Sequence, residues 1–93
     1  MRNYKVDYQN GFVTNYMFCE LVDVKKDIDE NCTYTQNDIK IIDLATDTIV
    51  SKRVWCGCLD GLEIFDNPIQ FGNYGYYSDW MNDVSIGGDI DFN

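Results

Sequence analysis

The 93-residue chain contains no histidine, a single proline, and no Lys or Arg beyond residue 53. Without histidine it lacks the side chain that most often acts as general acid and base near neutral pH. It also has no glycine-rich phosphate loop and no nucleophile motif. Carboxylate pairs alone support glycoside hydrolysis, but that chemistry needs a cleft that so short a chain seldom encloses. We therefore expect a protein that is not an enzyme and binds no cofactor.

Long apolar runs are also absent. No stretch of about 18 apolar residues occurs, so we expect no membrane span. The first residues, Met-Arg-Asn-Tyr-Lys-Val-Asp, are charged and polar where a signal peptide needs an apolar segment. These observations predict a cytoplasmic protein, located in the host cell cytoplasm if a phage encodes it. Because 45% of the residues are hydrophobic, we expect residues 1–93 to fold as a single domain around one core.

Four cysteines, Cys19, Cys32, Cys56 and Cys58, raise the question of a zinc site or a disulfide. Zinc sites built from cysteine usually contain two closely spaced pairs, whereas Cys56 and Cys58 form the single close pair and have one intervening residue. A reducing cytosol disfavours a disulfide. The pair also lacks the two-residue spacer and the basic neighbours of a redox centre. We therefore expect small buried thiols in strands and no bound metal.

Charge is divided unevenly along the chain. All seven Lys and Arg residues lie within residues 1–53, where nine acids leave a net charge of −2. Residues 54–93 contain seven acids and no Lys or Arg, so they carry −7 of the total of −9. Direct binding to nucleic acid or anionic lipid requires Lys and Arg, so we expect neither. A basic protein partner fits this composition better.

The strongest secondary-structure signal is a pair of β-branched runs. Residues 39–44 and 48–55 flank the short polar turn Ala45-Thr46-Asp47, which predicts an antiparallel hairpin over 39–55 near the middle of a sheet. Before this hairpin we expect an edge strand within residues 1–11 that ends in a turn at 9–11, then a central strand over 12–24 and a surface loop over 25–36. After it we expect a short strand or a helical turn over 59–65.

The predicted loop 25–36 contains Asp27, Asp29 and Asn31, whose alternate spacing is that of the first ligands in a calcium-binding loop. The sixth position is Cys32, where such loops need Gly for a sharp turn. The twelfth is Asp38, where they have a bidentate Glu. We therefore interpret the segment as a solvated turn.

Residues 76–84 are the best helix candidate. Ser78 suits the N-cap, and Asp79 follows in the first turn, where the helix dipole favours a negative charge. Asp79 and Asp83, four residues apart, would share a helix face, with Trp80 near its apolar boundary. The alternating tail over 89–92 is a candidate for pairing with a sheet edge. The sequence thus predicts an α+β fold, a mostly antiparallel sheet of four to five strands with one short C-terminal helix.

Acidic side chains and aromatic rings gather in residues 54–93. Carboxylates imitate phosphates and aromatic anchors slow dissociation, so such a surface suits the basic groove of a nucleic-acid enzyme. Small viral inhibitors, including anti-restriction and anti-CRISPR proteins, often have this size and charge, although no motif here matches a particular family. We expect an acidic stoichiometric inhibitor, monomeric or homodimeric, that occupies the basic nucleic-acid-binding surface of a nuclease or CRISPR effector. The expected contact residues are Asp60, Glu63, Asp66, Tyr76, Tyr77, Asp79, Trp80 and Asp83.

Two other functions remain open. An immunity protein or antitoxin that neutralises a nuclease toxin would use the same acidic surface, and the neighbouring genes would distinguish it from an inhibitor. An oligomeric scaffold or accessory subunit would instead use its aromatic surface for self-association, which sedimentation would detect. The simplest alternative to all of these is an acidic face that serves solubility alone.

Overall fold

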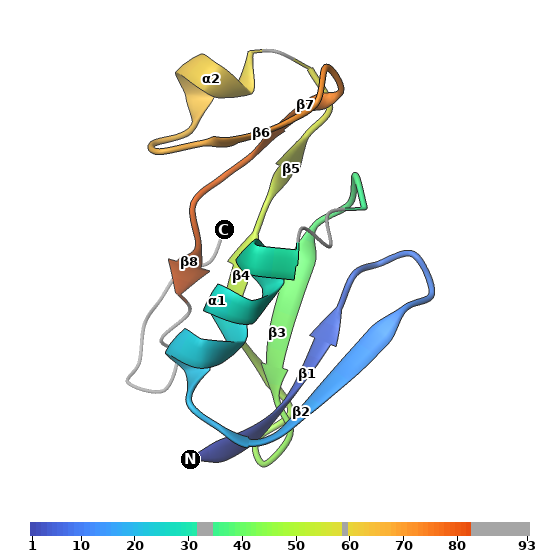
Figure 1. Ribbon diagram of the computed structural model, residues 1–93, viewed down its shortest axis with the longest axis vertical. Helices are drawn as coiled ribbons and strands as arrows, with labels where there is room; N and C mark the ends of the chain where they lie inside the picture. Colours follow the sequence, from blue (N-terminus) through green and yellow to red (C-terminus); the bar gives the residue numbers. More distant parts are fainter. Residues whose placement is uncertain (32–34, 59, 83–93) are drawn as a thin grey trace.

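Strands make up most of the secondary structure in the computed structural model, which describes residues 1–31, 35–58 and 60–82. They form two antiparallel sheets, one of five strands in the order β2-β1-β3-β4-β8 and one of three in the order β5-β7-β6 (Figure 1). The predicted α+β class with a mostly antiparallel sheet is confirmed. The elements are β1 (Arg2–Asp7), β2 (Val13–Cys19), α1 (Leu21–Asn31), β3 (Ile39–Asp43), β4 (Thr48–Arg53), β5 (Trp55–Cys56), α2 (Gly61–Ile64), β6 (Ile69–Phe71), β7 (Gly75–Tyr77) and β8 (Met81–Asn82).

The predicted hairpin is present, and β3 is the central strand of the larger sheet. β3 pairs with β4 so that Ile39 lies opposite Arg53 and Asp43 opposite Thr48. In the turn, Asp47 has a φ of 56°, a left-handed conformation that Asp adopts more readily than most residues. Its amide donates a hydrogen bond to the Asp43 carbonyl (2.7 Å). Trp55, predicted as the end of this hairpin, instead begins β5 in the second sheet.

The strand predicted at the centre of the sheet lies at its edge. β2 pairs with β1, and no described element lies beyond it. Phe12, Val13, Met17 and Phe18 are 51–71% exposed. The density of apolar residues over 12–24 indicated a strand covered on both faces, but the segment divides between an exposed edge strand and the first turn of α1.

Residues 25–31 of the predicted surface loop belong to α1. The amides of Asp23 and Val24 donate to the Glu20 carbonyl (3.1 and 3.2 Å), so the helix begins directly after β2. Val24 and Ile28, four residues apart, are each 1% exposed and pack on the sheet. Asp27, Asp29 and Asn31 therefore lie in a helix and not in a calcium-binding loop. Asp27 accepts a hydrogen bond from the Tyr16 hydroxyl (2.6 Å).

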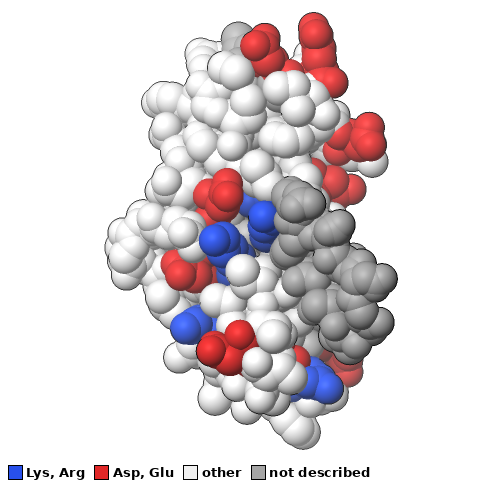
Figure 2. Space-filling view, turned by 180° about the vertical axis from the view of Figure 1, so that it is seen from behind, with Lys and Arg blue, Asp and Glu red and all other residues white. Residues whose placement is uncertain are grey.

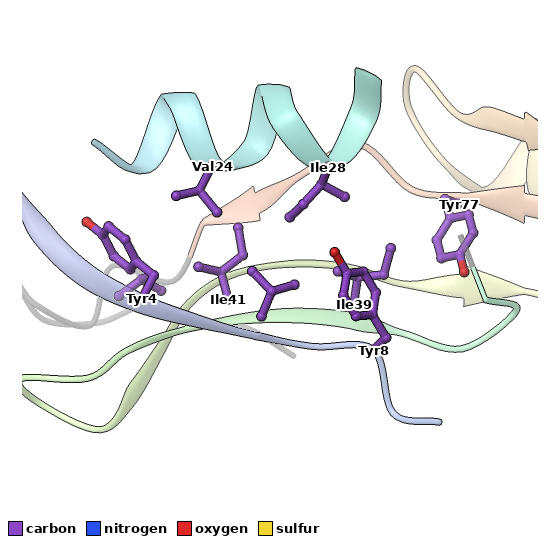
Figure 3. Close-up of a cluster of buried hydrophobic side chains, with 9 residues drawn as sticks. Tyr4, Tyr8, Val24, Ile28, Ile39, Ile41 and Tyr77 are labelled. Atoms are coloured by element: carbon purple, nitrogen blue, oxygen red, sulfur yellow. The ribbon is translucent and has the colours of Figure 1, made fainter. Parts of the chain in front are cut away.

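The hydrophobic core lies between α1 and the five-stranded sheet. Figure 3 shows Val24 and Ile28 of α1 facing Ile39 and Ile41 of β3. Burying each such side chain contributes about 1.5–3 kcal/mol relative to leaving it exposed. Tyr77 of β7 belongs to the same buried cluster, so the second sheet shares this core. The buried cluster consists of Tyr4, Val6, Tyr8, Val24, Ile28, Ile39, Ile41, Val50 and Tyr77.

Two chain segments connect the sheets. β4 continues through Val54 into β5, and β7 continues through residues 78–80 into β8 (Figure 1). These segments are joined where the Ser78 amide donates to the Val54 carbonyl (2.9 Å) and the Val54 amide donates to Ser78 Oγ (2.9 Å). A Cβ atom at position 75 would lie 2.0 Å from the Cys56 carbonyl oxygen, so close pairing of β5 with β7 requires Gly75.

The helix predicted over 76–84 is wrong for residues 76–82. These residues form the end of β7, the segment that crosses between the sheets, and β8. Ser78 is therefore not an N-cap, and it is 2% exposed between the sheets. The rest of that prediction, including Asp83, and the tail over 89–92 lie outside the described residues. Neither α1 nor α2 is long and apolar enough to cross a membrane.

Candidate functional site

Three of the predicted site residues lie in the connection between β5 and β6, which contains α2. The carbonyl of Asp60 accepts hydrogen bonds from the amides of Glu63 (2.8 Å) and Ile64 (3.1 Å), so α2 begins directly after it. Glu63 lies within α2, and Asp66 lies in the turn that follows. All three acids are exposed. We refer to Asp60, Glu63 and Asp66 as the acidic end.

The acidic end belongs to the small sheet unit at the top of the molecule in Figure 1. On the face seen in Figure 2, Lys and Arg atoms lie over the middle and lower parts, each close to Asp or Glu atoms. The upper part of that face shows Asp and Glu atoms without Lys or Arg. On this face, the charge asymmetry of the sequence is therefore also an asymmetry in space.

Apolar side chains are exposed in the same unit. Leu62 and Ile64 of α2 are 61% and 64% exposed, and Tyr74, between β6 and β7, is 59% exposed. Residues of these types are usually buried, so the acidic end combines negative charge with an apolar surface. Sequence reasoning missed all three as contact residues. The sequence signal for their exposure was that Leu62 and Ile64 flank Glu63 in a segment too short to bury both apolar side chains.

A cleft of about 470 Å³ brings the predicted site residue Asp66 together with two others, Asp79 and Trp80, which follow later in the chain. Two carboxylates and an indole ring around an opening of this size match the chemistry of a Lys or Arg side chain, which pairs with carboxylates and packs on aromatic faces. The remaining lining residues are Ile64, Phe65, Asn67, Ser78 and Met81.

Part of this cleft is already neutralised by the protein itself, through Arg53. Its guanidinium is 3% exposed and forms a two-pronged ion pair with Asp29 of α1 (Nε–Oδ1 3.2 Å, Nη2–Oδ2 2.9 Å). Nη1 donates to the Ser78 carbonyl (2.5 Å) and lies 4.0 Å from Oδ1 of Asp79. The negative charge of Asp79 is therefore partly neutralised within the protein, and Asp79 would attract a cationic partner less strongly than the acids of the acidic end.

Trp80 is held in the same network. The Arg53 guanidinium lies 4.6 Å from the centre of the indole ring, and the indole Nε1 donates to Oδ2 of Asp29 (3.2 Å). Lys25 Nζ lies 5.9 Å from the ring, and burial lowers the pKa of this lysine from its usual value. Trp80 thus links α1 to the crossing segment, a structural role that accounts for its partial burial.

The prediction that Tyr76 and Tyr77 are exposed anchors is wrong. Tyr76 is 8% exposed and Tyr77 is fully buried. The Tyr77 ring packs against Trp55 with centroids 4.8 Å apart. Its hydroxyl accepts hydrogen bonds from the amides of Thr35 (3.0 Å) and Gln36 (2.8 Å). The tyrosines were predicted within a helix, whereas they lie in β7, the central strand of the small sheet, and Tyr77 belongs to the core cluster.

The expectation of buried thiols is also wrong for the close cysteine pair. Cys58 is exposed and Cys56 half-buried, and their Sγ atoms lie 3.3 Å apart. The backbone amide of Asp60 lowers the pKa of Cys58, but the hydrogen bond with the Cys56 thiol and smaller contributions outweigh it, so the pKa is raised overall. Among the described residues, no three Cys, Asp or Glu side chains are arranged to hold a metal ion.

Comparisons of the chain with protein families, with curated proteins and with solved structures find no match.

Proposed function

We propose that this protein is a stoichiometric inhibitor that uses its acidic end to bind the cationic nucleic-acid-binding surface of an enzyme. The observation that carries the proposal is the exposure of Asp60, Glu63 and Asp66 in a stretch of chain without Lys or Arg. Such an unbalanced group of carboxylates favours contact with Lys and Arg side chains that otherwise bind phosphates. An enzyme so occupied would be unable to hold its nucleic acid.

Apolar contacts would supply the slow dissociation that an inhibitor needs. Charge complementarity mainly accelerates encounter, whereas buried apolar and aromatic groups lower the dissociation rate. Leu62, Ile64 and Tyr74 are exposed in the same unit as the acids and take the place of the buried tyrosines as anchors. The contact surface therefore comprises the acidic end with these three residues. In the neighbouring cleft, Asp66 is the carboxylate that would pair with a Lys or Arg of the partner, since Arg53 already lies against Asp79 and Trp80.

The enzyme classes that best fit are nucleases and CRISPR effectors, whose nucleic-acid channels are lined with basic residues. The protein would then act in the cytoplasm of a bacterial host as an anti-CRISPR or anti-restriction factor encoded by a phage. It would need no cofactor, since binding alone blocks the channel. An immunity protein would act by the same contacts on a nuclease toxin, so the identity of the captured enzyme separates these two roles.

A capture experiment with two charge-matched triple variants tests the proposal. In the first variant, Asp60→Asn, Glu63→Gln and Asp66→Asn neutralise the acidic end. The control variant carries Asp23→Asn, Glu30→Gln and Asp47→Asn, three exposed acids outside the acidic end. The two variants have the same net charge and differ in where the charge was removed.

Each immobilised protein is incubated with bacterial lysate at low and high salt, and the retained proteins are identified by mass spectrometry. We expect the native protein and the control variant to retain a basic nucleic-acid enzyme at low salt and to release it at high salt. The acidic-end variant should retain none of it. Equal retention by both triple variants would refute the proposal, because charge position would then be irrelevant.

A further inference from the structure

Among the described residues, one edge of the five-stranded sheet is a strand without charged side chains. β2 forms this edge, and residues 8–19 contain no Asp, Glu, Lys or Arg although 25% of the chain is charged. Edge strands of monomeric proteins are usually protected by charged residues, proline or bulges. Here the backbone irregularity lies at Phe18, which has a φ of 60°, and leaves residues 13–16 in regular register with β1.

The hydrogen-bonding direction of β2 follows from its pairing with β1. The amide of Tyr8 donates to the carbonyl of Phe12 (3.2 Å), so the backbone polar groups of Phe12 point toward β1. Because these groups alternate along a strand, those of Thr14 and Tyr16 also point toward β1. The amides and carbonyls of Val13 and Asn15 therefore point away from β1, to the outer side of the sheet. Met17 lies next to the irregularity at Phe18, and its carbonyl accepts a hydrogen bond from the Cys19 thiol (3.2 Å).

The side chains of β2 alternate between the two faces of the sheet. Tyr16 lies on the face covered by α1, where its hydroxyl bonds to Asp27, so Thr14 lies on this face too. Val13, Asn15 and Met17 lie on the opposite face. Val13 is 51% exposed and Met17 is 60% exposed, so each has apolar surface available for a neighbouring strand.

We propose that β2 pairs with β2 of a second copy of this chain, antiparallel and with Asn15 on the twofold axis, joining two five-stranded sheets edge to edge. In this register Val13 faces Met17 of the second copy, and Thr14 faces Tyr16. Phe12 and Phe18, at the two ends of this segment, are 69% and 71% exposed. The segment Phe-Val-Thr-Asn-Tyr-Met-Phe is therefore complementary to itself about its central asparagine.

The self-complementary segment favours a second copy as the occupant of this edge, and the lack of charge there permits it. Two chains that each carry −9 repel wherever their carboxylates approach, so self-association is least costly where a surface is uncharged. The twofold axis places the two Asn15 amides together, and amides both donate and accept hydrogen bonds. A strand edge of this length buries less than the about 800 Å² per partner of a standard interface, so we expect micromolar dissociation.

The proposed dimer is independent of the proposed inhibition. β2 lies in the lower part of the molecule in Figure 1 and α2 at its upper end, so both acidic ends of the dimer stay accessible.

Sedimentation of two asparagine variants tests the pairing. Asn15→Asp places two carboxylates together on the axis, whereas the matched change Asn10→Asp lies in the adjoining turn. Asn10 Oδ1 accepts a hydrogen bond from the Phe12 amide (3.0 Å), which Asp preserves. We expect the native protein and Asn10→Asp to show a concentration-dependent monomer–dimer equilibrium, and Asn15→Asp to remain monomeric with an unchanged circular dichroism spectrum.

A cross-link tests the register directly and does not depend on how well Asn15→Asp folds. Directly opposite residues of a hydrogen-bonded antiparallel pair have Cα atoms about 5.5 Å apart, within disulfide range. Oxidation of Asn15→Cys should therefore give a disulfide between the two copies at position 15, whereas Asn10→Cys should give none at position 10. Two results would overturn the proposal. One is a native protein that stays monomeric at all concentrations. The other is protection of the β2 amides from hydrogen exchange when a captured enzyme is added, but not when the protein concentration is raised.

Discussion

The hydroxyl of Tyr77 donates a hydrogen bond to the carbonyl of Asn37 (3.0 Å) and accepts one from the amide of the same residue (3.3 Å). The amides of Thr35 and Gln36 bond to this oxygen as well. A single side chain of the small sheet therefore fixes the conformation of residues 35–37, shortly before β3. This explains why Tyr77 is fully buried although it carries a polar group.

Tyr77→Phe should destabilise the protein by about 1–3 kcal/mol, because backbone amides of residues 35–37 lose their acceptor while the ring stays in place. Urea denaturation measures this change. Hydrogen exchange should show faster exchange at Thr35 and Gln36. Tyr74→Phe is the matched control, since Tyr74 is 59% exposed, and it should alter stability by less than about 0.5 kcal/mol. Equal stability of the two variants would contradict the role given to the Tyr77 hydroxyl.

Asp29→Asn should also destabilise the protein, since it removes the charge paired with the buried Arg53. The carboxylate is partly exposed and Asp79 lies 4.0 Å from the same guanidinium, so we expect about 1–3 kcal/mol. Because Trp80 stacks on Arg53 and bonds to Asp29, its fluorescence should change in the folded state. The control is Glu30→Gln, an exposed neighbour on α1, for which stability and fluorescence should stay unchanged. A stable Asp29→Asn variant with native fluorescence would show that the network is dispensable.

Cys58 should react slowly with iodoacetamide at neutral pH in spite of its exposure. Thiolate is the reactive form, and a raised pKa keeps most Cys58 protonated at pH 7. The alkylation rate should therefore rise with pH beyond the ordinary range of a cysteine. In Cys56→Ala the neighbouring thiol is absent, so the midpoint of the rate profile should move to lower pH. A Cys58 thiol that reacts fast at pH 7 would contradict this assignment and revive a redox function for the pair.

The hairpin over β3 and β4 was predictable because the strand preference of its residues agrees with their place in the folded sheet. β-branched runs such as Ile39 to Ile42 favour strands, and the turn residues between the runs accept the tight reversal. The helix α1 was missed for a different reason. Its apolar residues, Leu21, Val24 and Ile28, have helical spacing, but the first two had been assigned to a strand, which left one apolar residue in a charged segment.

The errors at residues 76–80 arise from contacts that are remote in sequence. Gly75 allows β7 to approach β5 closely, and this pairing overrides the helical pattern seen over 76–84. The place of Trp80 depends on Arg53 and on Asp29, which is 51 residues away along the chain. No local pattern reports such a contact. By contrast, the exposure of Asp60, Glu63 and Asp66 was correctly expected, because it follows from composition alone.

Competition with nucleic acid tests the central claim most directly. The enzyme captured by this protein is loaded with fluorescently labelled nucleic acid, and the fluorescence anisotropy is followed as the protein is added. If Asp60, Glu63 and Asp66 occupy the site of the phosphates, the native protein should displace the nucleic acid at one chain per enzyme site, and the variant with all three acids neutralised should not. A stable ternary complex, in which the enzyme holds both the nucleic acid and the protein, would contradict the claim.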